Sequence, residues 1–383
     1  MSVKTKPLMR MVGGVIADSA RAARWLPDRP VTSTARWSPA RARAWHEQQG
    51  WLVGCNFVPS TAGNQLEMFQ ASTFDPDTIR RELTWAAGLG LNSIRLFLHD
   101  LLWRHDDGFL DRVDEVLRLA DGVGIGVMPV LFDGVWNPRP RLGDQGDPRP
   151  GVHNSMWVQS PGAELIADRA RWPELRAYVD AVLDRFGDDP RVQVWDLFNE
   201  PDNPNGFTYG SLELPNKRAA VTPLVDAVFD WATEADPSQP LTVGIWMGVH
   251  GRPERVSRLN EISLGRSDVL SFHSYRKREP LRHAVAHLSR YERPLLCTEW
   301  LARSSGSTVD LLEDFAELGV GAYHWGLVSG RSQTIHPWTS WLRPDRDGSD
   351  PWFHDLLRAD GTPYDPDEAA RFRRVTGAEP RSR

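Results

Sequence analysis

Residues 195–201 read Trp-Asp-Leu-Phe-Asn-Glu-Pro, and residues 294–300 read Pro-Leu-Leu-Cys-Thr-Glu-Trp. Both stretches contain a short apolar run, which predicts a buried β-strand, and both place a glutamate, Glu200 or Glu299, at the carboxyl end of that run. A carboxylate costs free energy in apolar surroundings unless it is paired or used in chemistry. The two stretches therefore predict strands whose carboxyl ends carry a functional pair of carboxylates.

The sequence on either side of these stretches alternates strand patterns with helix patterns along most of the chain. Apolar runs predict eight strands, at residues 51–57, 92–98, 125–132, 192–198, 241–246, 268–275, 294–300 and 321–328. Helices are predicted between them, with starts at Ser38-Pro39, Asp75-Pro76 and Thr222-Pro223, and a last helix is predicted at about residues 352–359. Strands that are apolar throughout are typical of a parallel sheet that is covered on both faces.

Eight strand–helix units close naturally into a (β/α)8 TIM barrel, whose active site lies at the carboxyl ends of the strands. An open doubly wound sheet is the alternative, but it usually carries a glycine-rich phosphate turn after its first strand, and residues 57–61 here read Phe-Val-Pro-Ser-Thr. We therefore expect an α/β fold with long βα loops and one catalytic barrel over residues 37–375. Residues 1–36 are expected to form an N-terminal arm and residues 376–383 a tail.

The composition limits the partners and the location of the protein. The 383 residues include 45 Lys and Arg against 51 Asp and Glu, a net charge of −6 that argues against nucleic acid or an anionic membrane as a partner. No apolar run reaches the ~18 residues of a membrane span, and the apolar run at residues 11–17 lacks a cleavage site, so we expect a cytoplasmic protein. The 17 tryptophans are unusual, and their flat apolar faces suit pyranose rings.

Polar and aromatic residues gather in or at the ends of the predicted strands, where a barrel enzyme needs them. These residues are Arg95 in the second strand, Asn199 and Glu200 after the fourth, His273 and Tyr275 at the end of the sixth, Glu299 at the end of the seventh and Trp325 in the eighth. A glycosidase needs two carboxyl groups, one on either side of the sugar bond that it cleaves. Glu200 and Glu299 are the candidates for that pair.

With these residues in place, the chain resembles a clan A glycoside hydrolase, close to the family-five cellulase and mannanase type and to the cellulase-like proteins labelled 1,4-β-xylanases. The resemblance covers roughly residues 50 to 345, and its most specific element is Asn199-Glu200-Pro201 combined with Glu299 three strands later. It implies a hydrolase of carbohydrate metabolism that cleaves a β-type glycosidic bond with retention, by double displacement through a glycosyl-enzyme ester.

The resemblance also implies a role for each matching residue. Glu200 matches the general acid/base and Glu299 the nucleophile, so we expect these two to be catalytic. Arg95 and Tyr275 match groups that hydrogen-bond the nucleophile and hold it ionised, and Arg95 is expected to lower the pKa of Glu299.

Three further positions match residues that contact the substrate or the acid/base. Asn199 matches the partner of the sugar 2-hydroxyl, His273 the histidine beside the acid/base, and Trp325 the platform beneath the sugar. The chain departs from the family after the third strand, where a histidine is usual and residues 131–136 read Leu-Phe-Asp-Gly-Val-Trp. Asp133 or Trp136 is therefore expected to occupy that part of the site.

Loop residues supply the remaining candidates for sugar contact. Glu67 follows the first strand, Asp100 follows the second, and Trp300 directly follows the nucleophile position. The loop at about residues 134–163 is long enough to wall off one end of a cleft, which favours an exo-acting enzyme on short oligosaccharides or glycosides.

Other functions fit the pattern less well but stay open. A transglycosidase would use the same site and differ only in excluding water from the ester intermediate, and a non-catalytic carbohydrate-binding barrel would usually lack one of the carboxylates. The 11 histidines show no metal-ligand spacing, so we expect neither a metal nor a cofactor. The sequence is compatible with glucose, mannose, xylose, galactose or a furanose as the sugar, because these differ by single hydroxyl contacts.

Overall fold

The computed structural model describes residues 33–246, 256–348 and 351–378. Its strands are β1 Val53–Asn56, β2 Ser93–Phe97, β3 Gly126–Val130, β4 Trp195–Asn199, β5 Leu241–Gly244, β6 Leu270–His273, β7 Leu295–Trp300 and β8 Gly321–Trp325. Its α-helices are α2 Pro39–Gln49, α3 Gln65–Phe69, α4 Pro76–Gly88, α5 Asp100–His105, α6 Phe109–Asp121, α7 Ala163–Ala167, α8 Trp172–Phe186, α9 Lys217–Ala235, α10 Arg258–Arg266, α11 Arg278–Leu288, α12 Leu312–Leu318 and α13 Pro366–Thr376.

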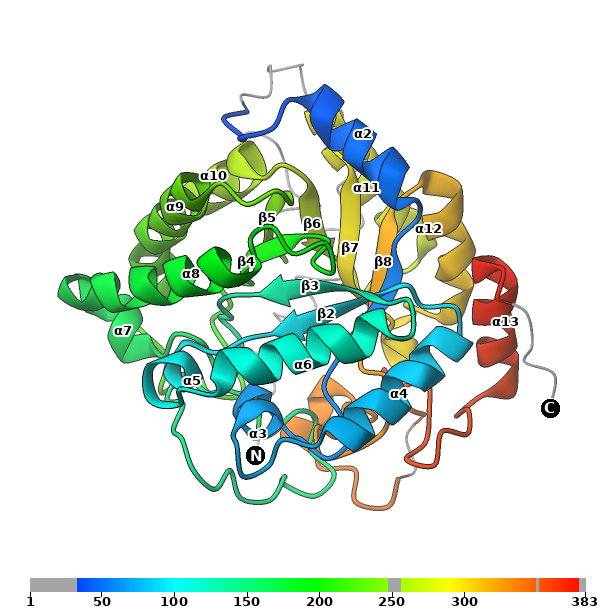
Figure 1. Cartoon of the computed structure of the whole chain (residues 1–383). Helices are drawn as coiled ribbons and strands as arrows, with labels where there is room; N and C mark the ends of the chain where they lie inside the picture. Colours follow the sequence, from blue (N-terminus) through cyan, green and yellow to red (C-terminus); the bar gives the residue numbers. More distant parts are fainter. Residues whose placement is uncertain (1–32, 247–255, 349–350, 379–383) are drawn as a thin grey trace, which may run out of the picture.

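The eight strands form one parallel sheet in the order β5-β4-β3-β2-β1-β8-β7-β6. A parallel bridge between Ile245 and Phe272 joins β5 to β6 and closes the ring, and the helices lie outside it (Figure 1). The predicted (β/α)8 barrel is confirmed, and all eight predicted strands are present.

Successive side chains along each strand face the helices and the barrel interior in turn, and both environments contain apolar clusters, so the sequence shows continuous apolar runs. Outward-facing side chains such as Ile94 and Leu96 pack in the large cluster beneath the helices. Inward-facing side chains form a separate small cluster at the amino ends of the strands, closed by Trp45 of α2; its members are Leu52, Met128, Val194, Val269, Leu296 and Tyr323. This apolar plug fills the lower barrel and leaves the carboxyl ends of the strands for polar residues.

Three helix predictions were wrong. Residues 352–359 form bends and a bridge from Leu357 to Val328 instead of a helix. The helix predicted to begin at Thr222-Pro223 begins at Lys217, with Pro223 inside it. The third error is the omission of α13, although Asp365 accepts from the backbone N–H groups of its first turn as a cap should.

The predicted arm lies outside the described residues except for residues 33–36. That short segment is tied to the barrel, since Thr34 N–H donates to the carbonyl of Gly265 at 2.7 Å and Arg36 contacts Asp268 at 3.3 Å. Over the described ranges, no helix is both long enough and apolar enough to cross a bilayer.

Candidate active site

Irregular strand pairing brings the key residues to the mouth of the barrel. The register shifts between β4 and β5 after Asp196, between β6 and β7 before His273, and between β7 and β8 after Cys297. Such bulges bend a strand locally and redirect its side chains. Glu200 then follows β4 in a left-handed conformation, with φ of 40°, and its N–H donates to the carbonyl of Gly244 at 2.9 Å.

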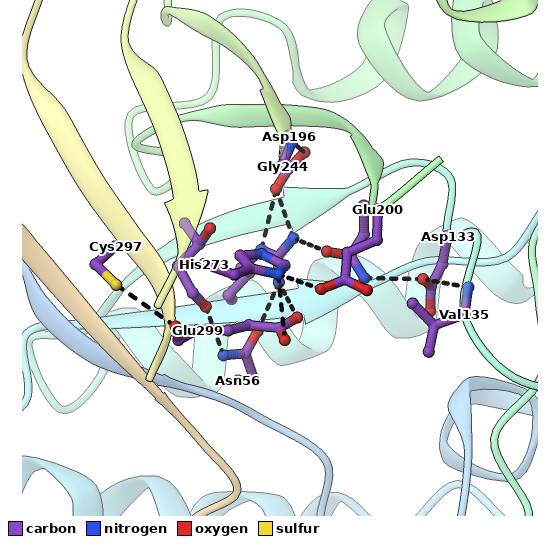
Figure 2. A network of polar contacts seen from close by, with 12 residues as sticks. Asn56, Asp133, Val135, Asp196, Glu200, Gly244, His273, Cys297 and Glu299 are labelled. Carbon is purple, nitrogen blue, oxygen red and sulfur yellow. Dashed lines mark hydrogen bonds and ion pairs between the residues drawn. The ribbon is translucent and has the colours of Figure 1, made fainter. Parts of the chain in front are cut away.

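A fully buried arginine, Arg95 of β2, is the centre of a polar network, and Figure 2 labels several of its partners, among them Asn56, Asp196 and Glu299. Its guanidinium donates to Asp196 Oδ2 at 2.7 and 3.0 Å, and to the side-chain oxygens of Asn56 at 2.8 Å and Asn199 at 2.7 Å. It also reaches Glu299 Oε1 at 3.2 Å. Four residues from three strands, β1, β4 and β7, therefore direct acceptors at one cation, which offsets the cost of burying it.

The two glutamates hold different partners. Glu299 accepts from the hydroxyl of Tyr275 at 2.8 Å, in addition to the contact with Arg95. Glu200 accepts from the side-chain amide of Asn203 at 2.6 Å, and its other oxygen lies 2.5 Å from Nδ1 of His273. His273 Nδ1 also lies 3.4 Å from Glu299, so the imidazole stands between the two carboxyl groups (Figure 2).

The two carboxyl groups are close and only slightly exposed. One ligand atom each from Glu200, Glu299 and His273 lie within 4.8 Å of one another. Burial raises the pKa of Glu200 to about 7 and that of Glu299 to about 7. Arg95 acts in the expected direction on Glu299, but burial outweighs it, so the expectation of a lowered pKa is wrong. The pair can therefore hold one proton near neutral pH.

The contacts indicate which carboxyl group keeps that proton. Glu299 accepts hydrogen bonds from the guanidinium of Arg95 and the hydroxyl of Tyr275, and both favour its ionised form. Glu200 instead accepts a hydrogen bond from a neutral amide, that of Asn203. Burial lowers the pKa of His273 to about 4, so the imidazole is neutral beside them. The arrangement favours a protonated Glu200 next to an ionised Glu299.

The side chain of Asn199 is held at both ends. Its oxygen accepts from Arg95, and its nitrogen donates to Asp133 at 2.9 Å. Asp133, fully buried after β3, also accepts from the indole N–H of Trp157 at 2.6 Å. The structure thus places Asp133 against Asn199, at the strand end where the sequence departs from the family.

Three aromatic rings border the network on the β1–β2–β8 side. Trp325 of β8 contacts Phe97 and Trp157 edge to face, with ring centroids 5.6 and 5.4 Å apart. Together with Asn56, these rings line a small recess at the mouth of the barrel. Trp325 therefore lies on the inner side of the sheet, as a sugar platform requires.

Loop residues build a wall at one side of the mouth, defined here as residues 141–157 after β3 and 331–345 after β8. Backbone groups connect the two segments, since Asn154 N–H donates to Ser332 O at 2.9 Å and Asp345 N–H to Gly151 O at 3.0 Å. Arg331 fastens this wall to α3 through Glu67 at 3.0 Å.

Aromatic side chains stand at or beside this wall. Trp136, the predicted site residue after β3, stacks on Trp341 with ring centroids 5.6 Å apart and planes at 10°. Trp338 meets Tyr275 edge to face at 4.9 Å, and so reaches the residue that donates a hydrogen bond to Glu299. Trp136 contributes to the mouth through this stack rather than through the Arg95 network.

The structure does not bring three predicted residues into the network around the two glutamates. Trp300 is fully buried and packs against Phe315 and Phe372 on the helix side, because Glu299 takes the inward position. Asp100 is buried in an ion pair with Arg104 at 2.8 Å. The remaining residue, Glu67, braces the wall as described above.

The structure adds three residues that sequence reasoning missed. Asn56 and Asp196 are polar residues inside otherwise apolar strands, a signal that could have been read as inward-facing ligands for Arg95. Asn203, which contacts Glu200, lies in a polar loop that gives no comparable signal.

The side chains that could bind a metal ion are the same ones that form the carboxyl pair and its histidine. Within the described ranges, the one group of three or more metal-ligating side chains close enough to hold an ion comprises Glu200, His273 and Glu299. Each of these three side chains also has an Arg, Tyr, Asn or Glu partner.

No family model and no curated protein matches the chain. Among solved structures, the chain is similar to an endo-1,4-β-mannanase from Rhizomucor miehei, with 14% identity, a TM-score of 0.54, and coverage of 86% of this chain and 94% of that one. It is similar to an exo-β-1,4-mannosidase from Opitutaceae bacterium strain TAV5, with 20% identity, a TM-score of 0.57, and coverage of 86% and 59%.

A third similar structure is a GH5_18 protein from Streptomyces cattleya in complex with GlcNAc, with 14% identity, a TM-score of 0.54, and coverage of 87% of this chain and 82% of that one. These likenesses show a shared fold. The fold that the resemblance to clan A glycoside hydrolases implies is therefore confirmed.

Proposed function

We propose that the protein is a retaining glycoside hydrolase that removes a terminal sugar from a β-linked oligosaccharide or glycoside. The observation that carries this proposal is the pair of buried carboxyl groups, from each of which one oxygen lies within 4.8 Å of the other. Retaining glycosidases hold their carboxyl groups ~5–5.5 Å apart, whereas inverting enzymes need ~6.5–9.5 Å to admit a water molecule between them. The separation of Glu200 and Glu299 supports the retaining geometry.

In the first step, a carboxylate oxygen of Glu299 attacks the anomeric carbon as the bond to the leaving group breaks. Glu200 gives its proton to the leaving oxygen, so the aglycone departs as a neutral alcohol. Arg95 and Tyr275 hold Glu299 ionised and oriented for attack. The product of this step is a glycosyl ester on Glu299.

In the second step, the ester no longer carries the charge of Glu299, and Glu200 is now ionised. Glu200 takes a proton from a water molecule, which attacks the anomeric carbon and releases Glu299 as a carboxylate. His273 and Asn203 fix the two oxygens of Glu200 in both steps. The two inversions together retain the anomeric configuration.

The wall supports exo action. Its two segments are joined by backbone and side-chain hydrogen bonds, including Trp341 Nε1 to His153 O at 2.8 Å and His153 N to Ser340 Oγ at 2.8 Å. Trp338 of the same wall stands against Tyr275, which itself binds the nucleophile. A long polysaccharide cannot continue through such a wall, so we expect the cleft to accept only a chain end.

Contacts with the sugar follow from the inward-facing residues. Trp325 supplies an apolar face for the sugar ring, and Asn199 a donor for its 2-hydroxyl. The similar structures include proteins described as mannanase and mannosidase, which makes β-mannosides a natural first test.

The test is hydrolysis of a panel of nitrophenyl glycosides, β-pyranosides and furanosides of both anomers, with Glu299→Gln in parallel. We expect turnover of one member, a first-formed product with the substrate's anomeric configuration by NMR, and loss of turnover by at least about 10³-fold in the variant. An inverted product would refute the retaining mechanism. Transfer to added alcohols without hydrolysis would indicate a transglycosidase, and sugar binding without turnover would indicate a binding barrel.

A further inference from the structure

Asp133 is a buried carboxylate that no step of the proposed mechanism uses. Four donors point at it: the side-chain amide of Asn199 at 2.9 Å, the indole of Trp157 at 2.6 Å, the backbone N–H of Val135 at 3.1 Å and the amide of Gln65 at 3.3 Å. Asp133 is 1% exposed to solvent. Only an ionised carboxylate, which offers acceptors alone, can satisfy all four donors at once.

These contacts fix the orientation of the Asn199 amide. Its oxygen must face Arg95, because a guanidinium can only donate, and its nitrogen must face Asp133, because a carboxylate can only accept. Rotation of the amide by 180° would set donor against donor on one side and acceptor against acceptor on the other. After these two contacts, the amide keeps a second N–H that neither Arg95 nor Asp133 uses.

We propose that Asp133 is a positioning residue that, through Asn199, makes the site present an N–H donor to the hydroxyl next to the anomeric carbon. This inference rests on the proposed glycosidase function and deepens it. Without Asp133, the Asn199 amide would be held by Arg95 alone and could swing about that single contact. The sugar contact would then lose its fixed direction.

The cost of burying Asp133 supports this role. Desolvation raises the pKa of Asp133 to about 7, while the contacts from Asn199 and Trp157 act to lower it. A buried carboxylate held at such a cost is expected where its acceptors determine the orientation of other groups. Trp157, the second side chain that Asp133 fixes, contacts Trp325 edge to face, so the same carboxylate also braces the expected sugar platform.

The experiment compares Asp133→Ala, Asn199→Ala and the double variant on two substrates, the nitrophenyl glycoside that the wild type hydrolyses best and its 2-deoxy counterpart. We expect Asp133→Ala to lower kcat/KM by about 10²-fold on the first substrate, in line with the effect of misplacing a substrate-positioning group. On the 2-deoxy substrate, Asp133→Ala should lower kcat/KM less than about threefold relative to the wild type. In the Asn199→Ala background, adding Asp133→Ala should also lower kcat/KM less than about threefold. Equal losses on both substrates, or additive losses in the double variant, would overturn the proposal.

A matched control separates positioning from general damage. Asp268 is likewise a buried carboxylate, which accepts from the backbone N–H groups of Trp37 at 2.7 Å and Leu241 at 3.0 Å at the opposite end of the barrel. Asp268→Asn should lower the unfolding temperature but leave kcat/KM unchanged on both substrates. Where Asp133→Ala does not fold, Asp133→Asn replaces it.

A second readout does not depend on activity. In a crystal structure of the Asp133 variant, the side-chain nitrogen of Asn199 should leave its wild-type position, as judged after superposition of the barrel strands, while the side-chain oxygen keeps its contact with Arg95. An unmoved Asn199 would overturn the inference even if the wild type hydrolysed no glycoside. A wild type without activity, together with a displaced Asn199, would instead refute the proposed function alone.

Discussion

Replacing Tyr275 by phenylalanine tests the assignment of the nucleophile with little disturbance of the fold. The change removes one hydroxyl, which donates to Glu299 at 2.8 Å. The ring keeps its contacts with Trp338 at 4.9 Å and His354 at 5.5 Å. We therefore expect a folded protein that differs from the wild type chiefly in the hydrogen bonding of Glu299.

The expected magnitude follows from the kind of bond that is lost. A hydrogen bond to a charged group contributes about 1.5–3 kcal/mol, which corresponds to roughly 10- to 150-fold in a rate ratio. Tyr275 is partly exposed, so we expect the lower part of that range, about 10- to 50-fold in kcat/KM. The loss should fall mainly on formation of the glycosyl ester, since Glu299 carries its full charge only before that step.

The pH profile gives a signed prediction. Attack requires Glu299 to be ionised, and the hydroxyl of Tyr275 lowers the pKa of Glu299 against the burial that raises it to about 7. Without that hydroxyl the pKa of Glu299 rises further, so the acid limb of kcat/KM should move to higher pH. The alkaline limb, which reports loss of the proton from Glu200, should stay nearer its wild-type position.

The assay is kcat/KM across pH with the best nitrophenyl glycoside, beside a control that loses a comparable hydroxyl elsewhere. Tyr178→Phe serves as control, because Tyr178 is fully buried on α8 and donates to Leu131 O at 3.1 Å. It should destabilise the fold by about 1 kcal/mol and leave both limbs in place. A loss under threefold for Tyr275→Phe with an unmoved acid limb would refute the assignment of Glu299 as nucleophile.

Three further changes should separate folding from function. Gly134→Ala would place a Cβ 2.4 Å from the carbonyl oxygen of Glu200, so we expect at least tenfold lower kcat/KM and a loss of about 1–3 kcal/mol in denaturant unfolding. Arg331→Gln removes a contact with Glu67 in which only the arginine is partly exposed. It should raise KM severalfold for short glycosides and change the unfolding free energy by under ~1 kcal/mol; an unchanged KM would refute the wall's part in binding. Arg95→Met leaves buried carboxylates unpaired and should cost about 3–5 kcal/mol, visible as a large fall in Tm; a wild-type Tm would contradict the network's role in folding.

The barrel was predictable because its signal is repeated. Each strand contains a short apolar run, and eight copies of the same pattern leave few alternative folds. The start of α9 was predicted wrongly because tertiary contacts override the preference of proline for the first turn of a helix. Pro223 lies in the second turn of α9 and not at its start, since α9 extends back to Lys217, whose ammonium group is bound by Glu213 at 2.8 Å.

The candidate site was predictable where a residue's type and its strand position both carry information. Glu200, Glu299 and Arg95 belong to this class, because charged residues in apolar strands need partners, and the structure brings them together. Trp300 shows the limit of the same reasoning. Simple alternation could not assign its side, because the inward position at the end of β7 depends on a register shift that the sequence does not display.

The same register shifts explain why the geometry of the candidate site depends on the whole barrel and not on a local motif. In a regular strand, successive side chains alternate between the barrel interior and the helices. Here the pairing between β4 and β5 is irregular between Asp196 and Asn199, and both of these side chains nevertheless reach Arg95. Both neighbouring pairs of β7 are irregular as well, which sets Glu299 beside His273. Because Arg95 bonds to residues on either side of these irregularities, its pairing with Asp196, Asn199 and Glu299 stabilises the bulged backbone, and the bulged backbone in turn sets the spacing of the carboxyl groups.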